Sequence, residues 1–260
     1  MKERVTLTIE EELLKKIDNS IDGSKIKNRS HAVELLLRKG LGNIKPQKAF
    51  ILAGGKNNSG KSRSMVKIEG KAVLEHVIDL FKKHGINEII ISVSKKNQKI
   101  KKYFSDGSLW GVNIKYIEEE MPLGTGGPLN LAKEELKSTF VMCNADEIKD
   151  VDILDMFNFH KENEGLVTMA LTTVKDPSDY GVVLMNGNKV MAFIEKPSKD
   201  ISSRMINAGL YIIEPEIIKL LPEGYANLEQ NVFPKLVRAN KLIGYVFSGR
   251  WMDGKTVKNK

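Results

Sequence analysis

Residues 49–53 form an apolar run, Ala-Phe-Ile-Leu-Ala, that ends abruptly in Gly54 and Gly55. The run is long enough for a buried strand, and paired glycines let backbone N–H groups approach an anion closely because no Cβ stands in the way. The loop that follows supplies the cations Lys61 and Arg63. The segment therefore predicts a strand that ends in a phosphate-binding loop. The competing interpretation of this segment alone is a strand followed by a solvated turn.

Strand and helix patterns alternate beyond this point. Apolar runs near residues 89–93 and 140–143 are separated by stretches with helical spacing, of which the clearest runs from about Ala72 to His84. Strands that alternate with helices predict a mostly parallel, Rossmann-like α/β sheet with helices on both faces. Further strands are expected near residues 166–173, 182–185 and 190–194.

One enzyme class that fits the glycine loop is the P-loop kinases. Residues 55–62 read Gly-Lys-Asn-Asn-Ser-Gly-Lys-Ser, a formal match to the P-loop pattern, in which Lys61 would reach the terminal phosphates and Ser62 would bind magnesium. That motif needs a helix to begin at once so that its N-terminus faces the phosphate. The clear amphipathic helix starts only near Ala72, so the strand and the glycine loop are present but the helix does not follow at once.

A second class accounts for more of the chain. From residue 48 onward the sequence resembles the nucleotidyltransferases that make nucleoside-diphosphate sugars from a sugar 1-phosphate and an NTP. The resemblance rests on the order and spacing of short motifs over roughly 200 residues. These motifs are Leu-Ala-Gly-Gly at 52–55, Val-Lys-Ile-Glu-Gly-Lys at 66–71, Pro-Leu-Gly-Thr-Gly-Gly at 122–127, Asn-Ala-Asp at 144–146, Tyr-Gly-Val-Val at 180–183, Glu-Lys-Pro at 195–197, Asn-Ala-Gly at 207–209 and Trp-Met-Asp at 251–253.

The resemblance implies a role for each matching residue. Asp146 and Asp253 match the two aspartates that bind Mg²⁺, and Lys196 matches the lysine that contacts the sugar phosphate. The implied catalytic cations are Arg63, Lys61 and Lys196; the implied nucleotide-binding residues are Ala53, Gly54, Gly55, Glu119, Gly124 and Thr125; the implied sugar-binding residues are Gly181, Glu195 and Asn207. Metal and fixed cations suit this reaction because two anions meet and charge accumulates.

The glycine loop departs from the family pattern. The usual Gly-Gly-x-Gly-Thr-Arg stretch is replaced by a shorter loop, so the family's loop arginine has no match here, although Lys61 could reach the same phosphates. Arg63 stands where the family's catalytic lysine belongs, which keeps the charge but replaces a compact ammonium with a planar fork. Ala145 replaces the usual glycine before Asp146, and Gly254-Lys255 replaces the usual Ile-Gly after Asp253.

The first 42 residues are expected to form a separate module, followed by a linker over 43–47 and the nucleotidyltransferase domain over 48–260. Residues 5–9 alternate like a half-buried strand, Thr8 and Glu11 suit a capping box for a first helix, and Ser30 suits the cap of a second. Strand, helix and helix in this order resemble the ribbon-helix-helix family of DNA-binding domains.

A module this small cannot bury a core alone, and its lone strand has unpaired edges, so a homodimer through strand pairing is expected. The ribbon-helix-helix resemblance implies DNA contacts by Arg4, Thr6, Thr8 and Ser30. Threonine offers little direct base readout, so the alternative is a dimerisation device that never touches DNA.

Composition sets loose bounds on function. The net charge of +8 suggests a polyanionic partner, and one cysteine, Cys143, excludes an internal disulfide. No apolar run is long enough to span a membrane and no secretory signal is evident, so a cytoplasmic protein is expected.

The sequence therefore predicts a Mg²⁺-dependent enzyme that transfers a nucleotidyl group from an NTP to a sugar 1-phosphate, tethered to a ribbon-helix-helix dimer. The alternative is a ribbon-helix-helix transcription regulator whose degenerate nucleotidyltransferase domain only senses nucleotide or nucleotide sugar; the altered glycine loop favours that alternative. A P-loop kinase ranks third. Neither the base nor the sugar can be named from the sequence, because loop shape sets that specificity.

Overall fold

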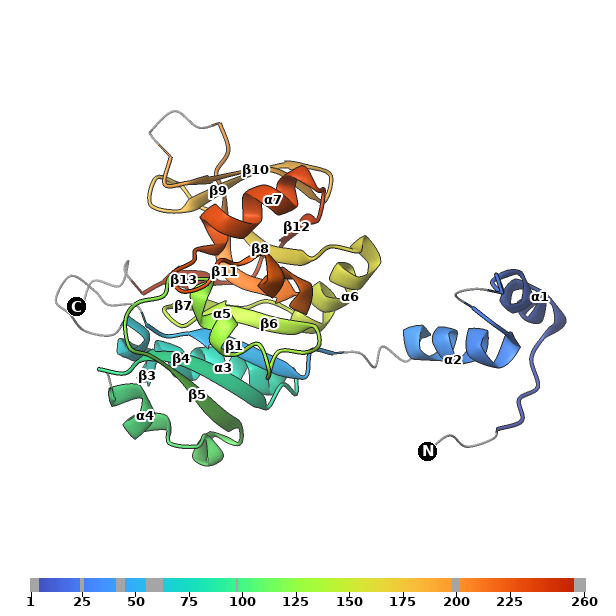
Figure 1. The fold of residues 1–260 in the computed structure, drawn as a ribbon, viewed down its shortest axis with the longest axis horizontal. Helices are drawn as coiled ribbons and strands as arrows, with labels where there is room; N and C mark the ends of the chain where they lie inside the picture. Colours follow the sequence, from blue (N-terminus) through green and yellow to red (C-terminus); the bar gives the residue numbers. More distant parts are fainter. Residues whose placement is uncertain are drawn as a thin grey trace. The chain divides into compact units, whose positions relative to one another are not determined.

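The computed structural model describes residues 5–23, 26–40, 45–54, 63–96, 98–197 and 202–254. The chain divides into two compact units, Met1–Lys45 and Pro46–Lys260, which are drawn in Figure 1. Three residues of the predicted sites, Arg4, Gly55 and Lys61, lie outside the described residues. None of the helices in the described ranges is long and apolar enough to cross a membrane.

The first unit contains two helices, α1 (Glu11–Asn19) and α2 (Arg29–Gly40). The Arg29 guanidinium joins them through two hydrogen bonds to the Asp18 carboxylate, at 2.8 and 2.7 Å. Among the described residues of this unit, Ile17 and Ala32 are buried, and Leu7 and Leu13 are more than half exposed. One copy of the unit therefore buries very little apolar surface.

The expected strand over residues 5–9 is not formed: residues 5–10 have no regular secondary structure in the single chain. The physical reason is that a strand needs a second strand to pair its backbone N–H and C=O groups, and the described part of one copy offers none. The described residues of the single chain therefore form two helices and do not show a ribbon-helix-helix arrangement.

The predicted helix caps are also displaced. α1 begins at Glu11 with no side-chain cap from Thr8, so the capping-box prediction is wrong. α2 begins at Arg29, two residues before the start that a Ser30 cap would give, because Asn28 Oδ1 accepts the His31 backbone N–H at 2.9 Å. Ser30 consequently lies within the first turn of α2 and does not cap it.

The second unit is built on a nine-stranded sheet in the order β5-β4-β1-β6-β11-β8-β12-β10-β9. Its first four strands are all parallel to their neighbours, as predicted. They are β5 (Asn113–Glu119), β4 (Glu88–Ser94), β1 (Lys48–Leu52) and β6 (Phe140–Asn144). β1 lies between β4 and β6 and has three buried residues in a row, which is typical of a strand covered on both faces.

The remaining strands make the sheet mixed. β11 (Met205–Ile213) is antiparallel to both β6 and β8 (Val167–Thr173), and β12 (Leu242–Val246) is parallel to β8. β10 (Lys189–Glu195) is antiparallel to β12 and to β9 (Gly181–Asn186). The prediction of a mostly parallel sheet is therefore wrong for this half. One cause is the two-residue turn between β9 and β10, which permits only an antiparallel pair.

Helices cover both faces of the sheet, as predicted (Figure 1). The amphipathic α3 (Val73–Lys83) packs with α4 (Lys99–Phe104) and α6 (Ile153–Asn163) against one apolar layer that contains Ile51 of β1. The opposite layer contains Phe50 and is covered by α5 (Gly127–Leu131), α7 (Phe233–Arg238) and the turns η3 (Pro215–Leu220) and η4 (Leu228–Val232). Cys143 is fully buried.

Two short ribbons lie outside the main sheet. β2 (Lys67–Ile68) pairs with β3 (Lys71–Ala72), and β7 (Glu147–Lys149), which follows β6, pairs with β13 (Trp251–Asp253). Ile68, Val73 and Ile148 form a small core between the ribbons, with Met252 packed against it. The β7–β13 pairing places the last described strand beside the turn that carries Asp146.

The segment after the glycine loop does not support a P-loop. The described chain resumes at Arg63 in a single 3₁₀ turn, η1 (Arg63–Met65), followed by the β2–β3 ribbon. α3 begins only at Val73, so the described residues after the motif contain no helix positioned to receive phosphate on its N-terminus. The helix that a P-loop kinase requires directly after this motif is therefore not found among the described residues.

A half-buried carboxylate, Glu214, links the end of β11 to α6. It accepts hydrogen bonds from Thr139 Oγ1 at 2.7 Å, Lys161 Nζ at 2.6 Å and His160 Nε2 at 3.2 Å. Burial opposes ionisation, but hydrogen bonds from His160, Lys161 and Thr139 outweigh it and hold the pKa of Glu214 at about 2, below its ordinary 4.5. Because this pKa is depressed on folding, the stabilisation is present above about pH 4.5 and is lost as the pH falls towards 2.

We therefore predict that Glu214→Gln lowers the free energy of unfolding at neutral pH by about 2 kcal/mol and flattens its fall on acidification. Urea denaturation at a series of pH values measures both effects. Glu216→Gln, on exposed η3, is the matched control and should change stability by less than about 0.5 kcal/mol. An acid profile of Glu214→Gln identical to that of the parent protein would contradict the assignment.

Candidate active site

A cavity of about 310 Å³ lies at the carboxyl ends of the four parallel strands. Leu52 ends β1, Ser94 ends β4, Glu119 ends β5 and Asn144 ends β6. The carboxyl edge of parallel strands is where open α/β sheets bind ligands. The complete lining comprises Leu52, Ala53, Gly54, Ser64, Ser94, Glu119, Pro122, Gly124, Thr125, Asn144, Ala145 and Asp146.

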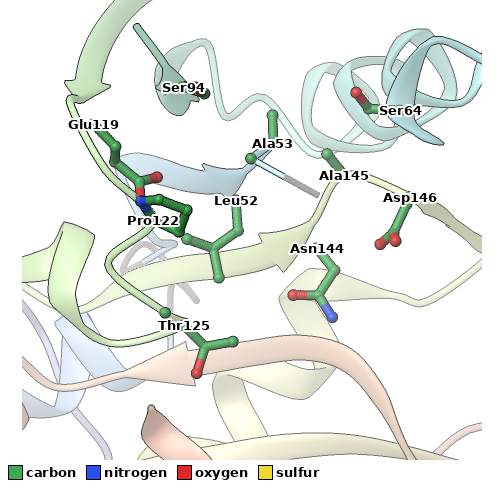
Figure 2. Close-up of a pocket in the computed structure, with 12 residues that line it drawn as sticks. Leu52, Ala53, Ser64, Ser94, Glu119, Pro122, Thr125, Asn144, Ala145 and Asp146 are labelled. Carbon is green, nitrogen blue, oxygen red and sulfur yellow. The ribbon is translucent and has the colours of Figure 1, made fainter. Parts of the chain in front are cut away.

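Six residues predicted from the sequence line this cavity: Ala53, Gly54, Glu119, Gly124, Thr125 and Asp146. In Figure 2, Glu119 and Asp146 lie on opposite sides, with Leu52 and Ala53 between them and Asn144 and Thr125 below. The predicted nucleotide-binding residues that the structure describes therefore come together at one place. Arg63, Asp253 and the sugar-side residues Gly181, Glu195, Lys196 and Asn207 are not part of the lining.

Glu119 is 7% exposed and makes two hydrogen bonds. Oε1 accepts the Ser92 hydroxyl at 2.5 Å, and Oε2 accepts the Leu123 backbone N–H at 2.9 Å. The first bond holds the carboxylate against β4, and the second holds the loop that follows β5. Glu119 therefore shapes one wall of the cavity.

The loop 122–127 is held on its other side by residues 226–228. Gly126 N–H donates to Ala226 O at 2.8 Å, and Ala226 N–H donates to Leu123 O at 3.0 Å. Gly124 has φ +78°, and a Cβ there would lie 2.4 Å from Ala226 O. Only glycine fits this conformation and this close approach without strain.

Asp146 lies in the turn between β6 and β7, beside the predicted partner aspartate. Asp253 is 3% exposed and pairs with Glu147 across the β7–β13 ribbon, and the Gly254 N–H donates to the Asp146 backbone oxygen at 2.9 Å. Residues more than 100 positions apart in the sequence are thus neighbours. Burial and the charge of Asp253 raise the pKa of Tyr180 to about 12, so its hydroxyl stays protonated beside the carboxylate.

Arg63 adds a cation to this pair. Its Nη1 lies 3.4 Å from Asp146 Oδ2. Its Nε is buried and has no hydrogen-bond partner among the described residues. A buried donor left without an acceptor costs stability.

The donor set suits Mg²⁺. Two carboxylates on neighbouring residues, one of them lining the cavity, match an ion that takes few protein carboxylates and completes its shell with phosphate oxygens and water. Within the described ranges, no group of three or more Asp, Glu, His or Cys residues could hold a metal ion alone. The site therefore fits an ion that arrives with a phosphorylated ligand.

The predicted sugar-side residues lie on β9, β10 and β11. Gly181 pairs with Glu195, and Lys196 Nζ lies 3.8 Å from Glu195 Oε1. Lys196 has φ +45°, an uncommon conformation for a residue with a side chain. Asn207 lies at an irregularity of β11, where its amide donates to the Tyr211 hydroxyl at 2.6 Å.

Glu229 interacts with both the nucleotide-side residue Thr125 and the sugar-side residue Glu195, and the sequence analysis missed it. Its Oε2 accepts the hydroxyl of cavity-lining Thr125 at 2.5 Å. Burial and the charge of nearby Glu195 raise the pKa of Glu229, while Thr125 opposes that rise. No local signal could have found Glu229, because its partner Thr125 is 104 residues away and its segment is a single π-helical turn, η4.

Comparison with known proteins places these features in a family context. Residues 48–258 match the family model described as "Nucleotidyl transferase". The chain is 33% identical over 217 residues to the mannose-1-phosphate guanylyltransferase catalytic subunit beta of Dictyostelium discoideum, a match that covers 79% of this chain and 60% of that protein. It is also 33% identical over 216 residues to the mannose-1-phosphate guanylyltransferase of Mycobacterium tuberculosis, with the same coverage. The chain thus spans about 60% of the length of these relatives.

Solved structures have the same fold. HddC from Yersinia pseudotuberculosis superposes with a TM-score of 0.68 at 25% identity, over 80% of this chain and 93% of that chain. A putative glucose-1-phosphate thymidylyltransferase from Bacillus anthracis superposes with a TM-score of 0.70 at 20% identity, over 80% of this chain and 90% of that chain. At that identity the second likeness concerns the fold alone.

The geometry of Gly124 gives a test of the loop. We predict that Gly124→Ala destabilises the protein by about 3 kcal/mol, because the new methyl group adds a clash with Ala226 O to the strain of positive φ. Thermal unfolding measures the loss.

Gly187→Ala is the matched control, since Gly187 also has positive φ, +58°, but has nothing within 4 Å of the new Cβ. It should cost about 1 kcal/mol, the strain alone. Equal losses in the two variants would mean that the contact between loop 122–127 and Ala226 is not tight.

Proposed function

Since the chain belongs to the nucleotidyl transferase family, we propose that its second unit transfers a nucleotidyl group from an NTP to a sugar 1-phosphate and releases pyrophosphate. The observation that carries the proposal is the neighbouring carboxylate pair, Asp146 and Asp253, at the carboxyl edge of the sheet, with the Arg63 guanidinium beside Asp146. GTP and mannose 1-phosphate are the first substrates to test, because the relatives described above are mannose-1-phosphate guanylyltransferases.

The reaction forms one bond and breaks one. An oxygen of the sugar phosphate, already ionised at neutral pH, attacks the α-phosphorus of the NTP. The bond between that phosphorus and the bridging oxygen breaks, and pyrophosphate leaves with the electron pair. No covalent intermediate and no general base are needed, so the protein's task is to bring two anions together and neutralise the charge that accumulates.

The proposed nucleotide site combines the described walls of the cavity with the predicted cations Arg63 and Lys61. Gly54 and Gly55 would face the phosphates with backbone N–H groups, and the segment from Glu119 to Thr125 would receive the base. Ala53 would line the nucleotide site without donating, because its N–H is bonded to Ser92 O at 2.9 Å. Arg63 and Lys61 would neutralise the phosphates. The position of Arg63 supports this role, because its Nη1 lies 3.4 Å from Oδ2 of the cavity-lining Asp146.

The sugar side is built from β9, β10 and β11. Lys196 would contact the phosphate of the sugar 1-phosphate, while Gly181, Glu195 and Asn207 would meet the sugar. The side chain of Lys196 is 64% exposed and its Nζ lies 3.8 Å from Glu195 Oε1, so solvent and ligands can reach the ammonium.

Asp146 and Asp253 would hold Mg²⁺. Bound there with the phosphates, the ion would act as a Lewis acid that stabilises charge on the reacting phosphate oxygens. The buried position of Asp253 and the backbone hydrogen bond between Gly254 and Asp146 would keep both carboxylates in place.

For the first unit we propose a ribbon-helix-helix-like dimer. The exposed apolar side chains Val5 and Leu7, 71% and 54% exposed in the single chain, support it because strand pairing with a second copy would bury them. Two further hypotheses depend on that dimer. The first is that DNA is contacted by Arg4, Thr6, Thr8 and Ser30. The second is the alternative function, a transcription regulator whose second unit is a catalytically inactive sensor.

Pyrophosphate release in Mg²⁺, across nucleoside triphosphates and a panel of sugar 1-phosphates, tests the proposed activity. We predict that Asp146→Asn and Asp253→Asn each lower kcat by at least about 100-fold, because each removes a metal carboxylate. Asp150→Asn is the matched control, since its exposed carboxylate lies on the same segment and pairs only weakly with Lys83 at 3.8 Å. A near-normal rate in either Asn variant would refute the metal assignment.

The dimer proposal has a separate test. Leu7→Glu should convert the protein to a monomer, because a charge would be placed on the apolar side of the proposed strand pair. Thr6→Glu, on the opposite side of the alternation, should leave the dimer intact. Sedimentation velocity distinguishes the two masses, and equal behaviour of the variants would exclude pairing through this segment.

A further inference from the structure

A charged pair is buried directly behind the proposed metal carboxylates. Lys149 of β7 has a side chain that is 0% exposed, and its Nζ lies 3.1 Å from Glu147 Oε2, where the Glu147 side chain is 14% exposed. Lysine is almost never fully buried unless it is paired. The same ammonium donates to Gly209 O at 3.0 Å and to Cys143 Sγ at 3.5 Å. All three of its donors therefore have acceptors.

Glu147 connects this pair to the two proposed metal ligands. Its carboxylate accepts from the Trp251 indole N–H at 3.2 Å and from the Asn144 amide at 3.3 Å. Trp251 begins β13, two residues before Asp253, and Asn144 ends β6, two residues before Asp146. One buried carboxylate thus ties together the strands on which both aspartates depend.

Lys149 connects the pair to the sugar side. Gly209 follows Asn207 in the irregular part of β11, and its N–H donates to Asn207 Oδ1 at 3.0 Å. Gly209 has φ +60°, and a Cβ there would lie 2.5 Å from Asn144 Nδ2 and 2.7 Å from Glu147 Oε2. The bulge therefore sits directly against the buried pair, and the Lys149 ammonium holds its carbonyl.

Stability alone gives a weak reason for such a pair. Removing two charges from water is costly, and apolar residues of similar volume often stabilise a fold as well or better. The pair instead fixes the positions of four strands relative to one another, because its donors and acceptors bond to residues of β6, β7, β11 and β13.

We propose that Glu147 and Lys149 are positioning residues that hold the Asp146 turn, the Asp253 strand and the Asn207 bulge in one arrangement. The effect of this arrangement on catalysis rests on the proposed function. The structural link itself, by which the buried pair holds the three segments together, does not. The two parts can therefore be tested separately.

The variants separate charge burial from positioning. Lys149→Met leaves Glu147 buried without its counter-ion and should lower the Tm by about 10 °C. The double variant Glu147→Gln/Lys149→Met removes both charges and should regain most of that loss, because no unpaired charge remains. Glu214→Gln, in the half-buried cluster at the end of β11 and on α6, is the control for destabilisation elsewhere in the fold.

Amide hydrogen exchange measures the structural link without any need for turnover. In the double variant, the Gly209 and Gly254 amides, which donate to Asn207 Oδ1 and Asp146 O, should exchange at least about tenfold faster, and in Glu214→Gln they should not. Exchange equal to that of the parent at both amides would overturn the proposal. If the double variant does not fold, Glu147→Gln alone is judged by the Gly254 amide in the same way.

Kinetics test the catalytic part. In the double variant, the KM for sugar 1-phosphate and the Mg²⁺ concentration for half-maximal rate should both rise about tenfold, a pattern that a loss of fold stability alone does not produce. Parent-like values for both in a variant with restored Tm would overturn the catalytic role. A parent protein that shows no turnover would refute the proposed function instead, while the exchange result would still decide the structural link.

Discussion

The parallel pairing of β1 with β4 and β6 is the constraint on which the candidate site depends. The registers match Leu52 with Ser92 on one side and with Asn144 on the other, and Ser94 with Glu119 one strand further out. Because parallel strands end at the same edge, the residues that follow them are brought together without any long-range contact of their own. The cavity, the Glu119 wall and the Asp146 turn all follow from this alignment.

Much of this half could be predicted from the sequence because its signals are local. The apolar run at residues 49–53, the helical spacing from residue 73 and the polar residues after each strand indicate both the elements and their carboxyl ends. Asp253 was identified through family resemblance alone, because its place beside Asp146 depends on the β7–β13 pairing between segments 100 residues apart.

The rest could not be predicted because it depends on contacts that no local pattern records. Strand direction in the β11 half follows from tertiary pairing, and Glu229 is defined by a hydroxyl 104 residues away. Nothing in the sequence around Lys149 distinguishes it from a surface lysine, yet its side chain is 0% exposed. The alternation over residues 5–9 predicted a strand that the single chain does not form, because a strand needs a partner to supply its hydrogen bonds.

The arrangement around Asp146 bears on whether the domain acts as an enzyme or only as a sensor. A sensor needs only a pocket that is complementary to its ligand. Here Arg63 lies 3.4 Å from Asp146, Asp253 is fixed beside it by a strand pair, and a buried ion pair secures both strands from behind. Fixing several charges in one geometry costs desolvation, and reaction chemistry uses such preorganisation whereas simple binding does not require it. On this physical ground, the arrangement supports the proposed transfer reaction over a sensor, even with the altered glycine loop.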